Sequence, residues 1–325
     1  MKNFYVFCLF FLFASQVKAQ CPDDTIVLTS QEDIDNFTTT YPNCTQLKSN
    51  LRILSSFGAE VPIRSLSGIS GITKVAGSIS IENTELVNLQ GLNNLVEIEN
   101  TFHLSNNTAL ESLMGLAQLA VIGHDLSLFE NPGLLNLTGL SNLTEVGRDF
   151  VLFGNISLTS LAGMDQLTSI GGEFALVDNS SLQEIDVLRT MTAIGRSITF
   201  DGNTELSSLI GLNNISSFGG YIEIVNHPNL SLCANQFLCT FLEENGEAFF
   251  QNNAVGCSTP VEILEQCSAS TNCPDKNLTL TITEDHRCAS TPLTFTSNAD
   301  NSRHLWDFGD GQTINTDESN QAQQT

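Results

Sequence analysis

The 325-residue sequence is poor in positive charge, in tryptophan and in long apolar segments. Twelve Lys and Arg residues stand against 36 Asp and Glu, which gives a formal net charge of −24. A surface of that sign repels a phosphate backbone, so nucleic acid is excluded as a partner. Beyond the amino-terminal segment no apolar run is long enough to span a bilayer, which excludes membrane insertion of the mature chain. One Trp beside 23 Gly indicates turn-rich β structure rather than helices.

The amino-terminal segment has the composition of a removable export signal. Lys2 precedes the apolar run from Phe4 to Ala14, and small residues follow at the spacing of a cleavage site. The apolar run is too short to form a stable membrane span. We therefore expect residues 1–19 to be a signal peptide and the mature chain to be secreted or displayed at the cell surface.

Cysteine is absent between residues 45 and 232 and is concentrated on both sides of that segment. Once Cys8 has left with the signal peptide, an even number remains, which favours disulfides in an oxidising compartment. The remaining cysteines are Cys21, Cys44, Cys233, Cys239, Cys257, Cys267, Cys273 and Cys288. Because the sequence has no Cys-x-x-Cys pair with a nearby His, we expect no metal site. No motif indicates a cofactor.

The segment without cysteine repeats every 24 residues. Each unit reads Leu-x-Gly-Leu-x-x-Leu-x-x-Ile-Gly, followed by an alternating apolar pair and then by Asn. The recurrent residues at this last position are Asn107, Asn131, Asn155, Asn179 and Asn203, followed by His227. A fixed period of this length indicates a solenoid, in which equivalent residues stack in columns about 4.8 Å apart.

The Asn column predicts how the coils turn. An Asn amide can bond backbone groups at a turn and repeat that bond in the next coil, and Asn tolerates left-handed backbone. We expect His227 to be a substitute in the terminal coil rather than a ligand or a base. Leucine-rich repeats share the apolar-x-apolar-x-x-Asn pattern and place a helix or a 3₁₀ turn on the outer side. The rest of each unit favours short strands, so we expect an all-β, right-handed parallel β-helix.

Residues 21–267 resemble a receptor L domain, the ligand-binding β-helix of the epidermal growth factor and insulin receptor ectodomains. The resemblance is carried by the opening segment Cys21-Pro-Asp-Asp through Tyr41-Pro-Asn-Cys44, by the coils, and by the closing Asn229-Leu-Ser-Leu-Cys233 with Cys267. Tandem coils this regular are typical of secreted bacterial relatives, particularly in the Bacteroidetes. The resemblance implies an extracellular binding protein whose partner is a protein or a glycan.

The predicted organisation places a cap at each end of the solenoid. Its parts are an N-terminal cap at 20–62, the 24-residue-repeat solenoid at 63–232, a Cys-rich C-terminal cap at 233–267 and a polar linker at 268–272. In the first cap we expect the bond Cys21–Cys44. The cysteines of the second cap allow three pairings, of which we favour Cys233–Cys257 with Cys239–Cys267. Residues 234–244 are the strongest helix candidate and would cover the open end of the solenoid.

Residues 273–325 resemble a PKD domain, a small Ig-like β-sandwich of extracellular proteins. The segment Trp306-Asp-Phe-Gly-Asp-Gly311 carries this resemblance, with Trp306 and Phe308 as alternating core residues before a glycine turn. Cys273–Cys288 would close the first hairpin. Because the sequence stops soon after Gly311, we expect an incomplete sandwich and a longer natural chain.

One outward column of the predicted strands carries acids. It consists of Thr101, Asp125, Asp149, Glu173, Ser197 and Tyr221. Stacked carboxylates can bind calcium or supply an acid/base pair, but an acid-rich surface with Arg148 and Arg196 alongside favours a solvated face. No nucleophile elbow, phosphate loop or His-based zinc motif is present, so we expect no enzymatic activity.

A second outward region is apolar. We expect Phe129, Phe153, Val151, Ala175 and Val177 to form an exposed patch with a polar rim, of the kind that marks protein or glycan contact sites. An aromatic stack that only stabilises neighbouring coils is the alternative. The sequence therefore predicts a secreted or cell-surface, non-catalytic binding or adhesion protein. The competing function is the accessory binding part of an exported hydrolase whose catalytic domain lies beyond residue 325.

Overall fold

The computed structural model describes residues 21–55 and 61–271, together with the strand segments 281–283, 293–296, 304–307, 313–316 and 321–324. The chain divides into two compact units, Met1–Cys267 and Ser268–Thr325. The predicted signal peptide at 1–19 lies outside the described residues.

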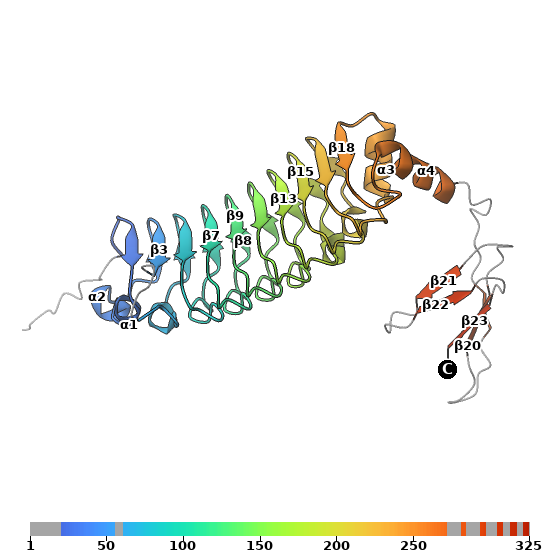
Figure 1. The fold of residues 1–325 in the computed structure, drawn as a ribbon. Coiled ribbons are helices and arrows are strands. Elements are labelled where there is room, and N and C mark those ends of the chain that lie inside the picture. The colour runs from blue at the N-terminus through green and yellow to red at the C-terminus, as the bar shows by residue number, and fades with distance from the viewer. Residues whose placement is uncertain are drawn as a thin grey trace, which may run out of the picture. The chain divides into compact units, whose positions relative to one another are not determined.

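The first unit is a solenoid built on one long parallel sheet (Figure 1). Within the described residues this sheet has ten strands, each paired in parallel with a strand of the next coil. The strands are β1 (Ile26–Leu28), β3 (Leu51–Leu54), β5 (Ile79–Glu82), β7 (Phe102–Ser105), β9 (Leu126–Phe129), β11 (Phe150–Phe153), β13 (Phe174–Val177), β15 (Ile198–Asp201), β17 (Ile222–Val225) and β18 (Ala248–Gln251). In the repeating coils, residues 24 apart face each other, as Leu126, Phe150 and Phe174 do. The sequence period therefore sets the register.

A second parallel sheet of two-residue strands forms another side of the solenoid. Where the structure is described, its members are β2 (Gln46–Leu47), β4 (Lys74–Val75), β6 (Glu97–Ile98), β8 (Val121–Ile122), β10 (Glu145–Val146), β12 (Ser169–Ile170), β14 (Ala193–Ile194) and β16 (Ser217–Phe218). The remaining side consists of turns and the short 3₁₀ helices η1 (Ser67–Ile69), η2 (Asp186–Thr190) and η3 (Ile210–Leu212). The mostly β architecture with long parallel sheets confirms the expected solenoid.

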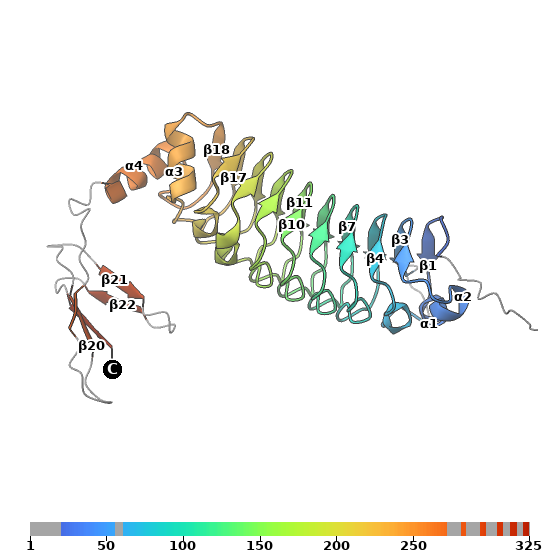
Figure 2. The same cartoon turned by 180° about the vertical axis from the view of Figure 1, so that it is seen from behind.

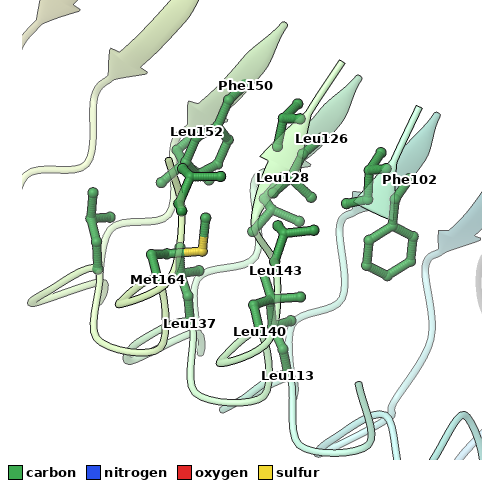
Figure 3. Close-up of a cluster of buried hydrophobic side chains, with 14 of the residues drawn as sticks. Phe102, Leu113, Leu126, Leu128, Leu137, Leu140, Leu143, Phe150, Leu152 and Met164 are labelled. Carbon is green, nitrogen blue, oxygen red and sulfur yellow. The ribbon is translucent and has the colours of Figure 1, made fainter. Parts of the chain in front are cut away.

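The core is a set of stacked apolar columns enclosed by the coils (Figure 3). Phe102, Leu126 and Phe150 point inward from successive strands of the long sheet and are fully buried. Leu113 and Leu137 close the same layers from the turn side. Further along, the Phe150 and Phe174 rings stack with their centroids 5.3 Å apart. Because a single coil would leave its apolar side chains exposed to water on the sides where the next coils pack, the coils are stable only as a stack.

The buried Asn residues form a continuous hydrogen-bonded column, which we call the Asn ladder. The Oδ1 atom of Asn155 accepts bonds from the backbone N–H and the amide nitrogen of Asn131, at 3.1 and 3.2 Å. Asn155 in turn donates to the carbonyl oxygen of Leu128 and to Oδ1 of Asn179. The same pattern recurs in the ladder residues Asn107, Asn131, Asn155 and Asn179. The ladder therefore satisfies polar groups that the coils bury.

The sequence suggested that the ladder Asn itself adopts the left-handed backbone conformation at the turn. In the structure a different residue does so. Positive φ occurs one residue earlier in each coil, at Asn106, Glu130, Gly154, Asp178, Gly202 and Asn226. The ladder Asn keeps negative φ because its amide must point into the core to reach the next coil. The preceding residue absorbs the sharp change of chain direction, and Gly or Asn does so with the least strain.

Both caps contribute strands to the long sheet, so the solenoid is longer than predicted. Strands β1 and β3 precede the predicted start at residue 63, and β18 follows the predicted end at 232. The helices α1 (Gln31–Asp35) and α2 (Phe37–Thr40) lie at one end, and α3 (Gln236–Glu243) and α4 (Pro260–Thr271) lie at the other (Figure 2). The caps therefore combine helices with strands of the long sheet. Helix α3 falls within the predicted helical segment.

Disulfides close both caps. In the described part of the chain they are Cys21–Cys44, Cys233–Cys257 and Cys239–Cys267. These pairings are the ones favoured in the sequence analysis. Asn235 adds a polar link, because its side chain caps α3 by accepting from the Leu238 N–H and donates to the carbonyl oxygen of Leu209. The last coil is thus tied to the helix that covers it.

The predicted polar linker at 268–272 begins at the boundary between the two units, and helix α4 continues into it as far as Thr271. Thr259 caps the start of α4 by accepting a hydrogen bond from the Glu262 N–H. Neither Gly nor Pro interrupts the segment between Pro260 and Pro274, so the helix extends through the small polar residues.

The second unit contains antiparallel strands. Strands β19 (Thr281–Thr283), β20 (Leu293–Thr296) and β23 (Gln321–Gln324) form one sheet, and β21 (His304–Asp307) pairs with β22 (Thr313–Thr316). Trp306 lies opposite Ile314 in the register of that pair. Phe308, which carries part of the PKD resemblance, and the predicted disulfide pair Cys273 and Cys288 lie outside the described residues.

Candidate binding surface

The outer face of the long sheet presents two columns of strand side chains. In β11, Phe150 and Leu152 are buried in the core, whereas Val151 and Phe153 face outward and are half-buried. Strand β9 repeats this alternation, with Ser127 and Phe129 outward. The period-2 alternation of a strand therefore combines with the 24-residue register to arrange the outer residues in rows and columns.

One column is aromatic over successive coils. The rings of Phe129 and Phe153 have centroids 5.9 Å apart, and the ring of His103, which belongs to the adjacent column, lies 5.6 Å from Phe129. Val177 follows Phe153 in the sheet register. Burial lowers the pKa of His103, so this imidazole is neutral at pH 7. The rings of His103, Phe129 and Phe153 therefore form an uncharged set on the solvent side of the sheet, which we call the aromatic ladder.

The adjacent column contributes smaller side chains. Val151 lies between Ser127 and Ala175 in the register. Ala175 is only 5% exposed, so its prediction as an exposed patch residue is wrong. Its methyl group lies between Val151 and Thr199 of the flanking strands, and these larger side chains cover it. We call the set Phe129, Val151, Phe153, Ala175 and Val177 the apolar strip, of which Ala175 is the buried member.

The acidic column at the start of the same strands is engaged in structural hydrogen bonds. Oδ1 of Asp125 accepts from the backbone N–H of Asp149 at 3.2 Å, and Oδ1 of Asp149 accepts from the N–H of Glu173 at 2.8 Å. The Thr199 hydroxyl donates to Glu173 at 2.6 Å. Among the described residues, no group of three or more potential ligands could hold a metal ion. These carboxylates therefore act as a brace between coils, an arrangement that the spacing alone did not reveal.

A pocket of about 330 Å³ lies beside helix α3 and was not anticipated from the sequence. Phe218, Phe237 and Phe241 line it and contact one another, with centroid distances of 5.2 to 5.9 Å. Phe218 occupies the position at which the other coils carry Ile, Val or, in β2, Leu, and this aromatic departure from the repeat was the available signal. The pocket forms where the second sheet ends at β16 and α3 takes the place of a further coil.

Comparison with known families and proteins adds one positive finding. The receptor L domain family model matches residues 43–137, which include β2 through β9 and therefore His103 and Phe129. Searches among curated proteins and among solved structures give no match. The receptor L domain is a non-catalytic binding domain, so the match and the disulfides indicate an extracellular ligand-binding domain. No helix among the described residues is long and apolar enough to cross a membrane.

Proposed function

We propose that the protein is a secreted or cell-surface, non-catalytic binding protein that holds its partner on the apolar strip. The observation that carries this proposal is the placement of Phe129 and Phe153 on the solvent side of the sheet. The core beneath them is already complete, because Leu128 and Leu152 from the same strands fill it. Apolar side chains that the core does not require are characteristic of contact surfaces.

The contiguous strip lies on the middle coils, whereas exposed apolar residues elsewhere on the sheet, Val27 in β1 and Phe249 in β18, stand beside charged neighbours. This contiguity supports a site rather than a general property of the sheet. In β5 the equivalent outward residues are Ser80 and Glu82, and in β15 they are Thr199 and Asp201. An apolar column that served only to stabilise the stack would be expected along its whole length. A central apolar area with a polar rim is the usual anatomy of a protein contact site.

The remaining parts of the chain fit the same role. Residues 1–19 would direct export, and the disulfides of the caps would persist in an oxidising compartment. The PKD-like segment at 273–325 would act as a spacer or a second adhesive module. The structural bonds of Asp125, Asp149 and Glu173 favour a binding protein over an enzyme that uses this acidic column.

The proposal is tested by binding of the mature full-length chain to arrays of extracellular proteins and of glycans. Replacement of both strip aromatics, Phe129→Ser with Phe153→Ser, should reduce binding to any captured partner at least tenfold. Leu135→Ser is the matched control, because Leu135 is 47% exposed and lies on the turn side of its coil, away from the long sheet. A partner that binds the wild type and the double variant equally well would disprove the strip as the site.

A further inference from the structure

We infer that the partner held by the apolar strip is a basic polypeptide, which places apolar side chains against Phe129 and Phe153 and Lys or Arg side chains against the carboxylates beside them. This inference rests on the proposed function and specifies the chemistry of its partner. It follows from the charges along both edges of the strip and from the packing of its rings.

Acidic residues border the strip on both sides. The first border is the acidic column Asp125, Asp149 and Glu173, which precedes the strip in each strand. The second border follows the strip and consists of Glu130 and Asp178, with Gly154 at the equivalent position between them. Asp201 continues the column of Phe153 and Val177 and ends the strip. Corresponding positions on the two borders are five residues apart in the chain, roughly 16 Å at the rise of a strand. That width accommodates one helix with its side chains, at about 10–12 Å, or two extended segments.

The borders keep a net negative charge, although Arg148 and Arg196 lie alongside the first of them. Arg148 offsets part of the first border, lying 3.6 Å from Asp125 and 4.0 Å from Asp149. On the second border, Glu130 and Asp178 are exposed and form no ion pair with any described residue. Their left-handed backbone, with φ of 52° and 54°, ends the strand and places them at the rim of the sheet. Uncompensated carboxylates around a neutral apolar centre attract cationic groups and steer their approach.

The geometry of the aromatic ladder favours a polypeptide over a sugar. Stacking on a sugar requires a ring face that is open to solvent. The Phe129 and Phe153 rings are inclined by 35° to each other at 5.9 Å, and His103 approaches Phe129 at 41° and 5.6 Å. Phe129 therefore has a ring on either side, which restricts the access of a sugar to its faces. Aliphatic and aromatic side chains of a polypeptide can contact such rings without stacking on an open face.

The test uses the mature full-length chain and three synthetic peptides of equal length. One alternates Leu with Lys, the second Ser with Lys and the third Leu with Glu. The Leu-Lys peptide should bind at least tenfold more tightly than either of the others, and its affinity should fall as the salt concentration rises. Equal binding of the Ser-Lys peptide would indicate attraction to net charge alone and would overturn the inference.

Paired charge variants locate the interaction. Glu130→Gln with Asp178→Asn should weaken binding of the Leu-Lys peptide about three- to tenfold, because two of the bordering charges are removed. Glu111→Gln with Glu184→Gln is the matched control, since it removes two exposed carboxylates on the turn side of the coils and should change binding less than twofold. Equal losses in the two pairs would overturn the inference.

The Phe129→Ser/Phe153→Ser variant separates this inference from the proposed function. If that variant loses binding while the Glu130/Asp178 variant keeps it, the strip is a binding surface but charge does not select its partner. If both variants bind as the wild type does, both proposals fail. Displacement of the Leu-Lys peptide by a neutral glycan that binds more tightly would also overturn the basic-polypeptide assignment.

Discussion

The Asn ladder and the aromatic ladder run along the same coils and obey the same register, yet they differ in what surrounds them. Each Asn of the inner column bonds to the coils before and after it and is almost completely buried. Phe129 and Phe153 contact one another on the outside of the sheet and remain half-buried. A repeating sequence thus builds columns of two kinds, and only burial distinguishes a column required for folding from one available for contact.

This difference has an energetic meaning. Removing an Asn leaves buried backbone groups without partners, whereas removing an outer Phe exposes surface that already borders water. Stability should therefore respond strongly to the inner column and weakly to the outer one. The expected loss of stability decreases from the Asn ladder through the C-terminal cap and His227 to the acidic column.

The largest effect is expected in the middle of the Asn ladder. Asn155→Ala would leave the Asn131 N–H and the Leu128 carbonyl without their hydrogen bonds in the core. At about 1–3 kcal/mol for each unsatisfied group, the free energy of unfolding should fall by about 4 kcal/mol. Chemical denaturation monitored by circular dichroism measures this change. A loss below 1 kcal/mol would show that water replaces the amide and that the ladder is dispensable.

The next largest effect is expected in the C-terminal cap. Cys233 and Cys257 are fully buried and close a loop with a sequence separation of 24. Replacing both with Ser removes the constraint that the disulfide imposes on the unfolded chain and should lower the free energy of unfolding by about 3 kcal/mol. Thermal unfolding under oxidising conditions provides the comparison. Wild-type stability in this variant would mean that α3 and Asn235 hold the last coil without the disulfide.

A pH-dependent effect is expected where the ladder changes residue. Asn203 donates to Nε2 of His227 at 3.1 Å, Nδ1 of His227 has no hydrogen-bond partner, and burial lowers the His227 pKa from 6.5 to about 4. Between pH 6.5 and about pH 4, His227 is protonated in the unfolded chain but stays neutral in the folded chain. Stability should therefore fall as the pH drops from 6.5 towards 4, by about 2 kcal/mol at pH 5.

The matched variant for this effect is His227→Asn, which continues the ladder with its usual residue. The part of the pH dependence that arises from His227 should disappear, while stability at pH 7 should remain similar. Parallel denaturation curves at pH 7 and pH 5 test this expectation. The same pH dependence in both proteins would assign it to other groups, such as the acidic residues of the surface.

The smallest effect is expected in the acidic column. In Asp149→Asn, the side-chain oxygen can still accept the Glu173 N–H, and only the 4.0 Å contact with Arg148 loses its charge. The free energy of unfolding should change by less than about 0.5 kcal/mol. Asp149→Ala removes the acceptor and should be distinctly less stable than Asp149→Asn. Equal stability of the two variants would show that the brace between coils has no energetic role.

The repeating part of the fold was accessible from the sequence because one residue type recurs where one geometry recurs. The positions of Asn107 through Asn203 predicted both the register and the ladder, and the alternation around Leu126 and Phe150 predicted which residues face inward. Outside the repeating segment, the sequence predicted the strands and helices less completely. Strands β1 and β18 carry no 24-residue signature, and α4 depends on the Thr259 cap and on tertiary packing rather than on a periodic pattern.

The hydrogen-bond partners and the burial of side chains on the outer face were harder to predict from the sequence. Spacing placed Asp125, Asp149 and Glu173 in one column but could not show that backbone amides of the next coil occupy their oxygens. It placed Ala175 on the outer face but not beneath Val151 and Thr199, because coverage depends on the sizes of flanking side chains. The left-handed backbone occurs one residue before each ladder Asn. The tolerance of Asn for positive φ did not show which residue of the turn adopts it.

The measurement that tests the central claim most directly is the unfolding free energy of the Phe129→Ser/Phe153→Ser variant beside that of Asn155→Ala. If the outer rings form a contact surface, the double Phe variant should lose less than about 2 kcal/mol, no more than half of the loss caused by Asn155→Ala. A loss as large as that of Asn155→Ala would mean that the aromatic ladder belongs to the folding core and is not a surface reserved for a partner.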